Sequence, residues 1–527
     1  MRNSRRVRVS RLACGAVIAT LLGLFPATGA AQVSTIQVPS AAAPDTQTAI
    51  NQAAAIVTGA TPTDVVVEVA PGTYIPPSQL DVSGITNPAF TVTLRATQGP
   101  SRTTIDLSNV DGLVMFGDGT RNLVIDGFTI RNRVPNENLF TGGGIWFHNA
   151  ASVAVVNCHL DTTDVAIRFG VTDPALSAEY RVVNNTILAG QGSDPNSPDT
   201  TFGAGINMRT GYAPDTLPTG EIKLTVTGNV MRTNENPVRF INVATDGVGL
   251  FGNGSVIVTG NDMSSIFGST VQMRGGHGHM VAENHAHSSA IGFLIRSASG
   301  VIENNLIVNN VHGVFVFNDG QPTQRFPAEP GIIIRHNTIA DNAGTGIIYA
   351  DLLGTRDWLP NVYNNIVAFN NASGFASVSA ASTESSSASA FIPVSFNLLA
   401  SNDVFGNTLK NINFPFVDFN YVGVSNPQVE QPNYTGVINT GFDLAKNPEF
   451  TSPHTGDFTL SPGSPLINAG LTTRPTPFQD LALHLRDTPP DIGAYEFERD
   501  QNPSTALSAN TATSATQTGT KRKVPIE

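Results

Sequence analysis

Cysteine is nearly absent from this chain of 527 residues, which contains only two, and charged residues make up just 13% of it. Cys14 lies in an apolar N-terminal run that we expect to be removed, so the mature protein would keep Cys158 alone. A single cysteine excludes a disulfide framework, and the fold must therefore be stabilised by packing. Cys158 follows Val155 by three residues. We expect it to face the core as an inert thiol rather than to act as a nucleophile.

The sequence also lacks helical heptads and, after its first residues, any apolar stretch long enough to cross a bilayer, so we expect no membrane span. A formal net charge of -12 argues against nucleic acid as a partner. The start of the chain is basic, and an apolar run over residues 12–25 and several small residues follow. This pattern is typical of a secretory signal peptide, which we place at residues 1–31. The mature protein is therefore expected to be secreted or periplasmic.

A short strand pattern recurs between residues 142 and 351, with large apolar residues at its second and fourth positions. Its copies are residues 144–148, 166–170, 205–209, 237–241, 270–274, 292–296, 313–317 and 346–350. Successive side chains of a strand point to opposite faces, so the second and fourth positions face inward and the third and fifth face outward. The repetition predicts a solenoid rather than a series of domains.

A second element recurs between these strands: an apolar strand that ends at an asparagine. These asparagines are Asn185, Asn229, Asn261, Asn284, Asn305, Asn337 and Asn365. Asparagine tolerates the left-handed backbone of a sharp turn, and stacked asparagine side chains can satisfy one another's amide groups. We therefore predict an asparagine ladder. The irregular spacing, roughly 20 to 45 residues, is that of a repeat with one supersecondary unit per coil.

Two strands and a ladder in fixed order resemble the right-handed parallel β-helix proteins of the pectate lyase-like superfamily, over about residues 35–498. The resemblance implies an all-β fold, a right-handed parallel β-helix solenoid with a short N-terminal capping helix and a C-terminal cap. We expect the β-helix to span residues 32–400. Residues 401–498 would form the C-terminal coils and cap, and residues 499–527, rich in Ser, Thr and Ala, a disordered tail.

The two ends carry separate signals. Asp45 is a plausible N-cap, and Ile50, Ala53 and Val57 follow at helical spacing, which predicts an amphipathic helix that ends before Gly59 and covers the open end of the solenoid. Residues 447–496 resemble the closing module of many secreted bacterial β-helices. Within this segment we expect structural ion-pair partners, namely Asp480, Arg486 and Asp491.

The outward positions of the first strand pattern are rich in arginine. The third positions are Trp146, Arg168, Asn207, Arg239, Gln272, Leu294, Phe315 and Ile348, and the fifth positions are His148, Gly170, Arg209, Ile241, Arg274, Arg296, Phe317 and Ala350. Stacked coils lie about 4.8 Å apart, so the arginines would form a basic stripe on an acidic protein. A guanidinium binds a uronate carboxylate with two hydrogen bonds. We therefore predict an acidic polysaccharide as partner, with substrate-binding residues Trp146, His148, Arg168, Arg209, Arg239 and Gln272.

The two outward columns contain no carboxylate, and this restricts the chemistry. Glycoside hydrolysis ordinarily needs two carboxylates that flank the bond. Nearby turns do hold some: Asp161, Asp164, Glu235, Asp319 and Asp351. Residues 276–278, Gly-His-Gly, match a motif of polygalacturonase-like hydrolases, but the paired aspartate segments that should precede it are not visible. A lyase or uronate epimerase would instead neutralise the sugar carboxylate and remove the neighbouring C5 proton, work that arginine and histidine can share. For this role we predict Arg274, His277 and Arg296.

Two histidine pairs, His277 with His279 and His285 with His287, raise the question of a metal. His279 falls in the inward column of Leu224, Val256 and Ile332, whereas His285 and His287 point outward, so we expect that the pairs do not converge. The acidic calcium nest of the calcium-dependent pectate lyases is not found either. We therefore predict no metal and no other cofactor.

These observations favour an exported, monomeric protein that cleaves an acidic polysaccharide by β-elimination. Two alternatives stay open. One is a noncatalytic glycan-binding or surface β-helix protein, because the same fold also serves as a scaffold, and the other is a polysaccharide hydrolase.

Overall fold

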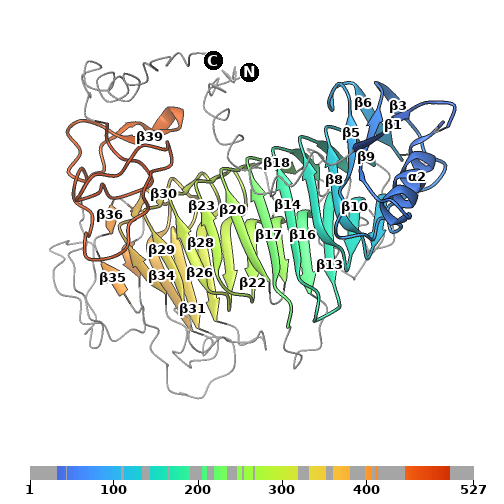
Figure 1. Ribbon diagram of the computed structural model, residues 1–527. Helices are drawn as coiled ribbons and strands as arrows, with labels where there is room; N and C mark the ends of the chain where they lie inside the picture. The colour runs from blue at the N-terminus through green and yellow to red at the C-terminus, as the bar shows by residue number, and fades with distance from the viewer. Residues whose placement is uncertain are drawn as a thin grey trace, which may run out of the picture.

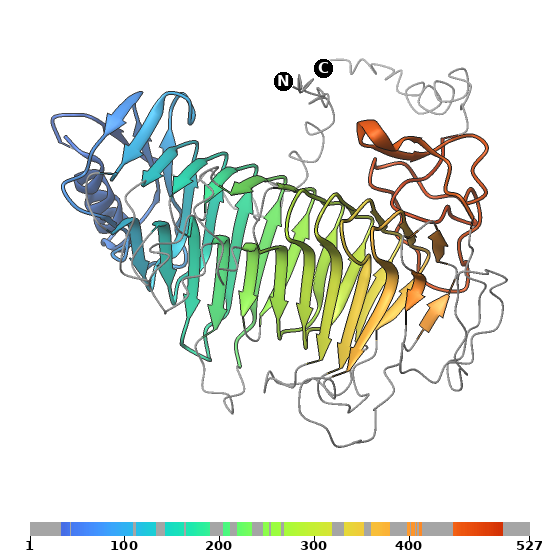
Figure 2. The ribbon, with the colours of Figure 1, turned by 180° about the vertical axis from the view of Figure 1, so that it is seen from behind.

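The computed structural model describes residues 33–42, 44–108, 112–132, 143–162, 165–189, 204–210, 219–233, 246–251, 254–264, 268–318, 331–351, 360–379, 398–400, 402–405, 407, 410–413 and 446–498. Its strands stack into three long parallel sheets, and each coil of the chain contributes one strand to each sheet (Figures 1 and 2). The predicted right-handed parallel β-helix is confirmed.

Sheet A contains β1 (Val33–Val38), β2 (Asp64–Val69), β5 (Val92–Ala96), β8 (Arg121–Asp126), β11 (Ala151–Val156), β14 (Ala178–Val183), β17 (Ile222–Thr227), β20 (Ser255–Thr259), β23 (His279–Ala282), β26 (Gly300–Glu303), β29 (Ile332–Arg335), β32 (Asn361–Tyr363) and β35 (Leu398–Ala400). Sheet B contains β3 (Gly72–Tyr74), β6 (Thr103–Asp106), β9 (Thr129–Asn132), β12 (His159–Thr162), β15 (Thr186–Ala189), β18 (Val230–Thr233), β21 (Asp262–Ser264), β24 (His285–His287), β27 (Leu306–Val308), β30 (Thr338–Ala340), β33 (Ile366–Ala368) and β36 (Asp403–Phe405).

Sheet C contains β4 (Leu80–Asp81), β7 (Leu113–Asp118), β10 (Gly143–His148), β13 (Ile167–Val171), β16 (Ala204–Thr210), β19 (Asp246–Phe251), β22 (Ser269–Arg274), β25 (Ile291–Arg296), β28 (His312–Asn318), β31 (Ile347–Asp351), β34 (Ser373–Ser379) and β37 (Lys410–Asn413). The recurring strand pattern of the sequence therefore forms sheet C. One copy is corrected: the strand between β16 and β22 is β19, not residues 237–241, which lie outside the described residues.

The core of the solenoid is built from the inward positions of all three sheets. Phe147 and Phe169 stack across neighbouring strands with ring centroids 5.9 Å apart, and Tyr180 continues the stack at 4.2 Å from Phe169. The Tyr180 hydroxyl donates to the Ala150 carbonyl oxygen at 2.7 Å, which satisfies its one polar group inside the core. Cys158 is also buried, as predicted, and burial raises the pKa of its thiol to about 12.

The N-terminal end is covered by α2 (Thr46–Thr58), whose first turn is capped by Asp45, because the Asp45 carboxylate accepts the Thr48 N–H at 2.8 Å. Its buried face carries Ile50, Ala53 and Val57, which belong to the same core cluster as the strands. The predicted capping helix is confirmed, and it lies at one end of the stack in Figure 1. No helix among the described residues is long and apolar enough to span a membrane.

The predicted asparagine ladder runs from Asn185 to Asn402 at the turn between sheets A and B. Each rung has the same geometry: the Asn305 amide nitrogen donates to Asn337 Oδ1 at 2.9 Å and to the Val281 carbonyl oxygen at 2.8 Å. A second ladder, not predicted, occupies the turn between sheets B and C and consists of Asn310, Asn342, Asn370 and Asn407. Each of its members follows an asparagine of the first ladder by five residues, and this constant spacing is the sequence pattern from which the second ladder could have been predicted.

The C-terminal segment, residues 446–498, contains β38 (Phe450–Ser452), η2 (Pro453–Thr455) and β39 (Asp457–Leu460) and packs on the flank of the last coils. Phe458 covers Leu306, Val308 and Ala340 on the outer face of sheet B. Leu466 and Ile492 cover Ile366 and Ala368 on the same sheet. The segment thus buries outward apolar side chains of sheet B.

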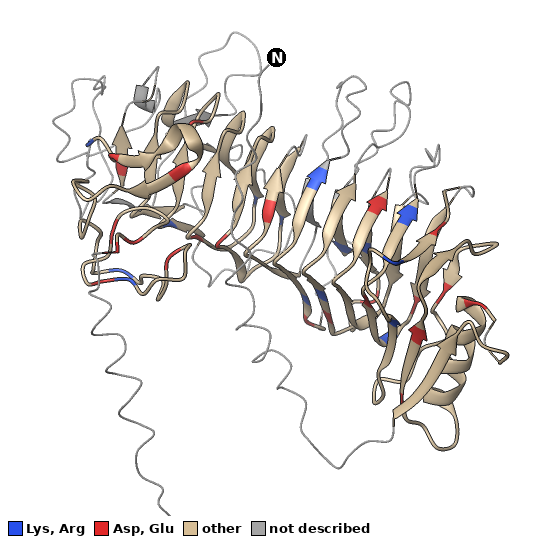
Figure 3. Ribbon diagram, turned by 90° about the horizontal axis from the view of Figure 1, so that it is seen from above, with Lys and Arg blue, Asp and Glu red and all other residues tan. Residues whose placement is uncertain are grey.

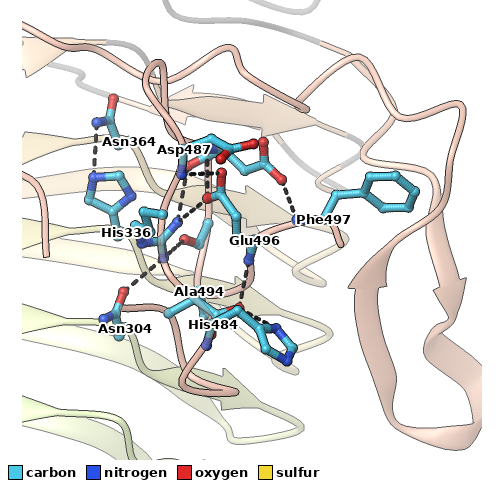
Figure 4. A network of polar contacts seen from close by, with 12 residues as sticks. Asn304, His336, Asn364, His484, Asp487, Ala494, Glu496 and Phe497 are labelled. Atoms are coloured by element: carbon cyan, nitrogen blue, oxygen red, sulfur yellow. Dashed lines mark hydrogen bonds and ion pairs between the residues drawn. The ribbon is translucent and has the colours of Figure 1, made fainter. Parts of the chain in front are cut away.

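A buried polar network fixes this segment to the turn between sheets A and B (Figure 4). The Arg486 guanidinium donates to Asn304 Oδ1 at 2.8 Å and forms an ion pair with Glu496 at 3.1 Å. Asp480 and Asp491, expected as ion-pair partners, accept backbone N–H groups: Asp480 from Glu496 at 2.7 Å and Asp491 from Phe497 at 2.6 Å. Asp480 Oδ2 also lies 3.5 Å from His484 Nδ1. Burial raises the pKa of Glu496 to about 7 against the hydrogen bonds that favour its charged form.

Candidate functional site

The outer face of sheet C holds most of the predicted site residues, and the strand register defines its two columns. Trp146, Arg168, Asn207, Gly249, Gln272, Leu294, Phe315 and Ile348 are consecutive register partners in the first column, and His148, Gly170, Arg209, Phe251, Arg274, Arg296, Phe317 and Ala350 in the second. The places expected for Arg239 and Ile241 are taken by Gly249 and Phe251. Arg239 itself lies outside the described residues.

The columns extend further toward the N-terminus than the sequence pattern indicated, through β7 and, in the first column, to Asp81 on β4, and this brings in carboxylates. Asp118 on β7 is the register partner of His148, and its Oδ1 lies 2.8 Å from His148 Nδ1. On the other side of the ring, Thr172 Oγ1 lies 3.2 Å from His148 Nε2. In the tautomer in which Nδ1–H donates to Asp118, Nε2 carries the lone pair of the imidazole. Asp118 and Thr172 thus fix the orientation of the His148 ring.

Trp146 forms an aromatic platform beside this pair. Its ring meets Phe116 edge-on with centroids 5.6 Å apart, and the Arg168 guanidinium carbon lies 4.9 Å from its ring centroid. The Trp146 indole nitrogen and Asn207 Oδ1 are both buried, and neither has a hydrogen-bond partner within the described structure.

Gly170 lies in the middle of this group, where a side chain would press on Trp146 and His148. It is the register partner of His148 on one side and of Arg209, which is exposed, on the other. A Cβ atom at Gly170 would lie 3.3 Å from the Trp146 indole nitrogen and 3.5 Å from His148 Cδ2. The absence of a side chain at Gly170 therefore lets the Trp146 and His148 rings pack over this strand, and Arg209 follows His148 two strand spacings, or about 9.6 Å, along the sheet.

The predicted catalytic group is distributed over two strands and a turn. Arg274 and Arg296 are register partners on β22 and β25, both half-buried, and the Arg296 guanidinium carbon lies 5.9 Å from the Phe317 ring centroid. His277 lies in the turn that connects β22 to β23, between glycines at φ +78 and +64. Gln272 is on the same face and is 6% exposed. Arg274 and Arg296 are thus adjacent, as expected.

Two separate centres therefore lie on one face. From His148 on β10 to Arg274 on β22 the sheet takes four strand steps, about 19 Å at the usual spacing. A general base must lie within hydrogen-bond reach of the proton that it removes, so these two groups cannot act on the same bond. They can contact different sugar units of one chain along the sheet.

The histidine pairs do not converge, because His279 points into the core. Its Nδ1 accepts the Val256 N–H at 3.1 Å, and its Nε2 lies 2.9 Å from the Gly275 carbonyl oxygen, so it closes the turn that carries His277. His285 and His287, by contrast, stack on the outer face of sheet B with ring centroids 4.2 Å apart. Burial lowers the pKa of His285 to about 4. Beside them lies Asp262, the register partner of His285, which was not among the predicted site residues.

Charges on the outer face of sheet B are otherwise neutralised across strands. Arg131 lies 3.4 Å from Asp106 and 3.6 Å from Asp161 on its two neighbouring strands. Figure 3 shows strands with basic and with acidic segments following one another along the upper face. The clustered arginines of sheet C are therefore a local feature and not a property of the whole solenoid.

Comparison with known proteins supports the fold. Residues 224–392 match the family model described as a right-handed beta helix region, and the resemblance to right-handed parallel β-helix proteins is confirmed. No curated protein sequence matches this chain.

Solved structures similar to this chain include the periplasmic alginate epimerase AlgG, at 11% identity and a TM-score of 0.38 over 67% of this chain and 74% of that one. The A-module of the Azotobacter vinelandii mannuronan C-5 epimerase AlgE6 is 14% identical with a TM-score of 0.37, over 76% and 94% of the two chains. The alginate lyase AlyF-OU02 is 12% identical with a TM-score of 0.38, over 79% and 96%.

Proposed function

We propose that this protein is an exported enzyme that binds an acidic polysaccharide along sheet C and cleaves it by β-elimination. The observation that carries the proposal is the His148 imidazole, held at Nδ1 by Asp118 at 2.8 Å, with Arg209 two strands further along the same column. A base oriented by a carboxylate and placed opposite a cation is the arrangement that removal of a proton next to a carboxylate requires.

The steps follow from these positions. Arg209 and Arg168 pair with the uronate carboxylate, which makes the C5 proton more acidic because the developing negative charge is stabilised. His148 Nε2 takes the C5 proton, the electron pair forms the C4–C5 double bond, and the C4–O bond breaks. The leaving oxygen takes up the proton that the His148 imidazolium gives back, with the Thr172 hydroxyl, at 3.2 Å from His148 Nε2, as the relay, so that imidazole and threonine both return to their starting forms. Trp146 stacks on a sugar face.

The second centre has a binding role in this proposal. Arg274 and Arg296 lie about 19 Å from His148 along the sheet, where they meet carboxylates of more distant sugar units. Gln272 and Leu294 lie beside them in the first column. The set predicted from the sequence, Arg274, His277 and Arg296, is the alternative catalytic centre. The experiment below distinguishes the two.

The test measures the ultraviolet absorbance of the unsaturated product while the mature protein is incubated with alginate, pectate and glycosaminoglycans. We expect a rise that His148→Ala abolishes, that Asp118→Asn lowers about 10²- to 10⁴-fold, and that His277→Ala largely keeps. Lys223→Ala, a cation on the outer face of sheet A, is the matched control for Arg209→Ala. Circular dichroism of each variant excludes unfolding as the cause of a lost signal.

Other results have defined meanings. A rise that is lost in His277→Ala and Arg274→Ala but kept in His148→Ala would move the catalytic centre to the second group. Uronate epimers without chain cleavage would identify an epimerase, and shorter products without absorbance a hydrolase. Binding without any product would identify a noncatalytic glycan-binding protein. Export stays a prediction, because residues 1–31 lie outside the described residues, and release of the mature chain from cells checks it.

A further inference from the structure

Sheet B carries a second group of converging side chains, on a different sheet from the proposed carbohydrate site. We propose that Asp262, His285 and His287 bind one divalent transition-metal cation of the zinc, cobalt and nickel type. Each of the three offers one ligand atom, and these atoms all lie within 4.8 Å of one another. This site is independent of the proposed polysaccharide chemistry.

The strand geometry brings the ligands together. His285 and His287 are two residues apart on β24, so both side chains point to the outer face, and Asp262 on β21 is the register partner of His285. Asp262 Oδ1 lies 3.1 Å from His287 Nε2 and 3.7 Å from His285 Nδ1. Ligand atoms around a tetrahedral zinc ion with bonds near 2.0 Å are about 3.3 Å apart. The observed separations bracket that value. The two rings are stacked with their planes 26° apart, so both must rotate to direct their lone pairs at one ion.

The donor set selects the class of ion. Two imidazoles and one carboxylate suit zinc and its first-row neighbours, whereas calcium and magnesium prefer oxygen ligands alone. Arg232 orients the carboxylate: its guanidinium contacts Asp262 Oδ2 at 2.6 Å, which leaves Oδ1 directed at the histidines. Arg232 also cancels the charge of Asp262, so we expect an affinity in the micromolar range rather than the tighter binding of structural zinc sites.

The surroundings leave one side of the site accessible. On the C-terminal side, the register partners of His285 and His287 are Leu306 and Val308, which are buried beneath Phe458 of the C-terminal segment. On the N-terminal side, Asp262 is the register partner of Val230, which is 38% exposed. An ion would therefore bind at the edge of the C-terminal segment, with an apolar wall on one side and solvent on the other.

The experiment titrates the full mature chain, purified without a histidine tag and treated with a chelator, with Co²⁺ at neutral pH. Visible absorption reports bound Co²⁺, and competition with Zn²⁺ reports the zinc affinity. We expect one equivalent to bind. His287→Ala should weaken binding at least 10-fold, and so should Asp262→Asn, which keeps the shape of the side chain and its contact with Arg232. His277→Ala, a histidine outside the group, should leave the titration unchanged.

Several results would overturn the assignment. These are no binding at 100-fold molar excess of Co²⁺ over a micromolar protein concentration, binding that survives both His287→Ala and Asp262→Asn, or Ca²⁺ binding at the same place in preference to Co²⁺. Circular dichroism of the variants separates loss of the site from loss of the fold. The readout is metal absorption, so failure here leaves the proposed lyase activity untouched.

Discussion

Removal of one rung from the middle of the first asparagine ladder should be among the most destabilising single substitutions in this protein. The Asn305 side chain makes five hydrogen bonds. Its Nδ2 donates to the carbonyl oxygens of Val281 and Glu303 and to Asn337 Oδ1, and its Oδ1 accepts from the backbone and side-chain nitrogens of Asn284, all at 2.8 to 3.0 Å. Asn305→Ala deletes all five inside a buried turn.

The expected magnitude follows from these contacts. A net contribution of about 1 kcal/mol per hydrogen bond gives about 5 kcal/mol as an upper value. Some partners keep another contact: Asn337 Oδ1 still accepts the backbone N–H of residue 305 at 3.0 Å, and Asn284 Nδ2 still donates to the Val258 carbonyl oxygen at 2.8 Å. We therefore expect a loss of about 3 to 5 kcal/mol.

Cys158 provides a matched control at the start of the same ladder. Its sulfur lies 3.2 Å from the Val156 carbonyl oxygen and 3.8 Å from that of Ile125, and its backbone N–H already donates to Asn185 Oδ1. These two carbonyl oxygens correspond to the ones to which the amide nitrogens of Asn229 and Asn305 donate in the same ladder. Cys158→Asn should therefore extend the ladder and leave the free energy of unfolding within about 1 kcal/mol of the wild type or above it.

The assay is urea unfolding followed by far-ultraviolet circular dichroism and by tryptophan fluorescence. Repeat arrays can unfold in parts, so a free energy is taken only where the two transitions coincide. The reasoning is refuted if Asn305→Ala stays within about 1 kcal/mol of the wild type, or if Cys158→Asn destabilises the protein as much as Asn305→Ala does.

Three further predictions address Gly170, the C-terminal segment and the thiol. Gly170→Leu should raise KM for the polysaccharide at least 10-fold, because the new side chain crowds the Trp146 and His148 rings and displaces them; an unchanged KM in steady-state kinetics would show that substrate does not contact these rings. Burial raises the pKa of Glu496 to about 7, so protonation of this side chain stabilises the folded state relative to the unfolded state. This contribution to the free energy of unfolding is fully present below pH 4.5 and is lost as the pH rises through 7. The melting temperature should accordingly fall more steeply between pH 5 and 8 in the wild type than in Glu496→Gln, and parallel curves would contradict this. Cys158, with a pKa raised to about 12 by burial, should react with a thiol reagent only after unfolding, and rapid labelling of the native protein would argue that its coil opens.

The sequence predicts the parts of this fold that repeat. Alternating apolar residues and turn asparagines impose the same physical demand in every coil, so the solenoid and the first ladder follow from the sequence alone. The position of β19 cannot be predicted in this way, because Val238 and Phe240 fit the alternation as well as Val248 and Leu250 do. Pairing with β16 and β22 decides between the two segments, and a one-dimensional pattern does not contain that information.

The strand pattern in the sequence does not reveal Asp118, because the alternation of apolar and polar residues is absent from its strand. In β7 the residues Leu113, Val114, Met115 and Phe116 are all apolar, so the outward place of Asp118 is not evident from hydrophobicity. The sheet B group did carry a signal. Asp262 and His285 each follow a ladder asparagine directly, and residues at equal distance from the ladder stack in register, so their proximity was contained in the spacing.

The solenoid also makes the two proposed sites energetically separate. His148 belongs to the coil of β10 and His287 to the coil of β22, four coil spacings away, which is about 19 Å along the axis. Residues so far apart, with no shared partner, usually contribute additively. The effects of His148→Ala and His287→Ala on activity and on Co²⁺ affinity should therefore combine in the double variant without interaction, as kinetics and titration of all three variants can measure. A coupling above 10-fold would mean that the coils between them transmit strain, and the sheet would then have to be treated as one cooperative unit rather than as a series of nearest-neighbour contacts.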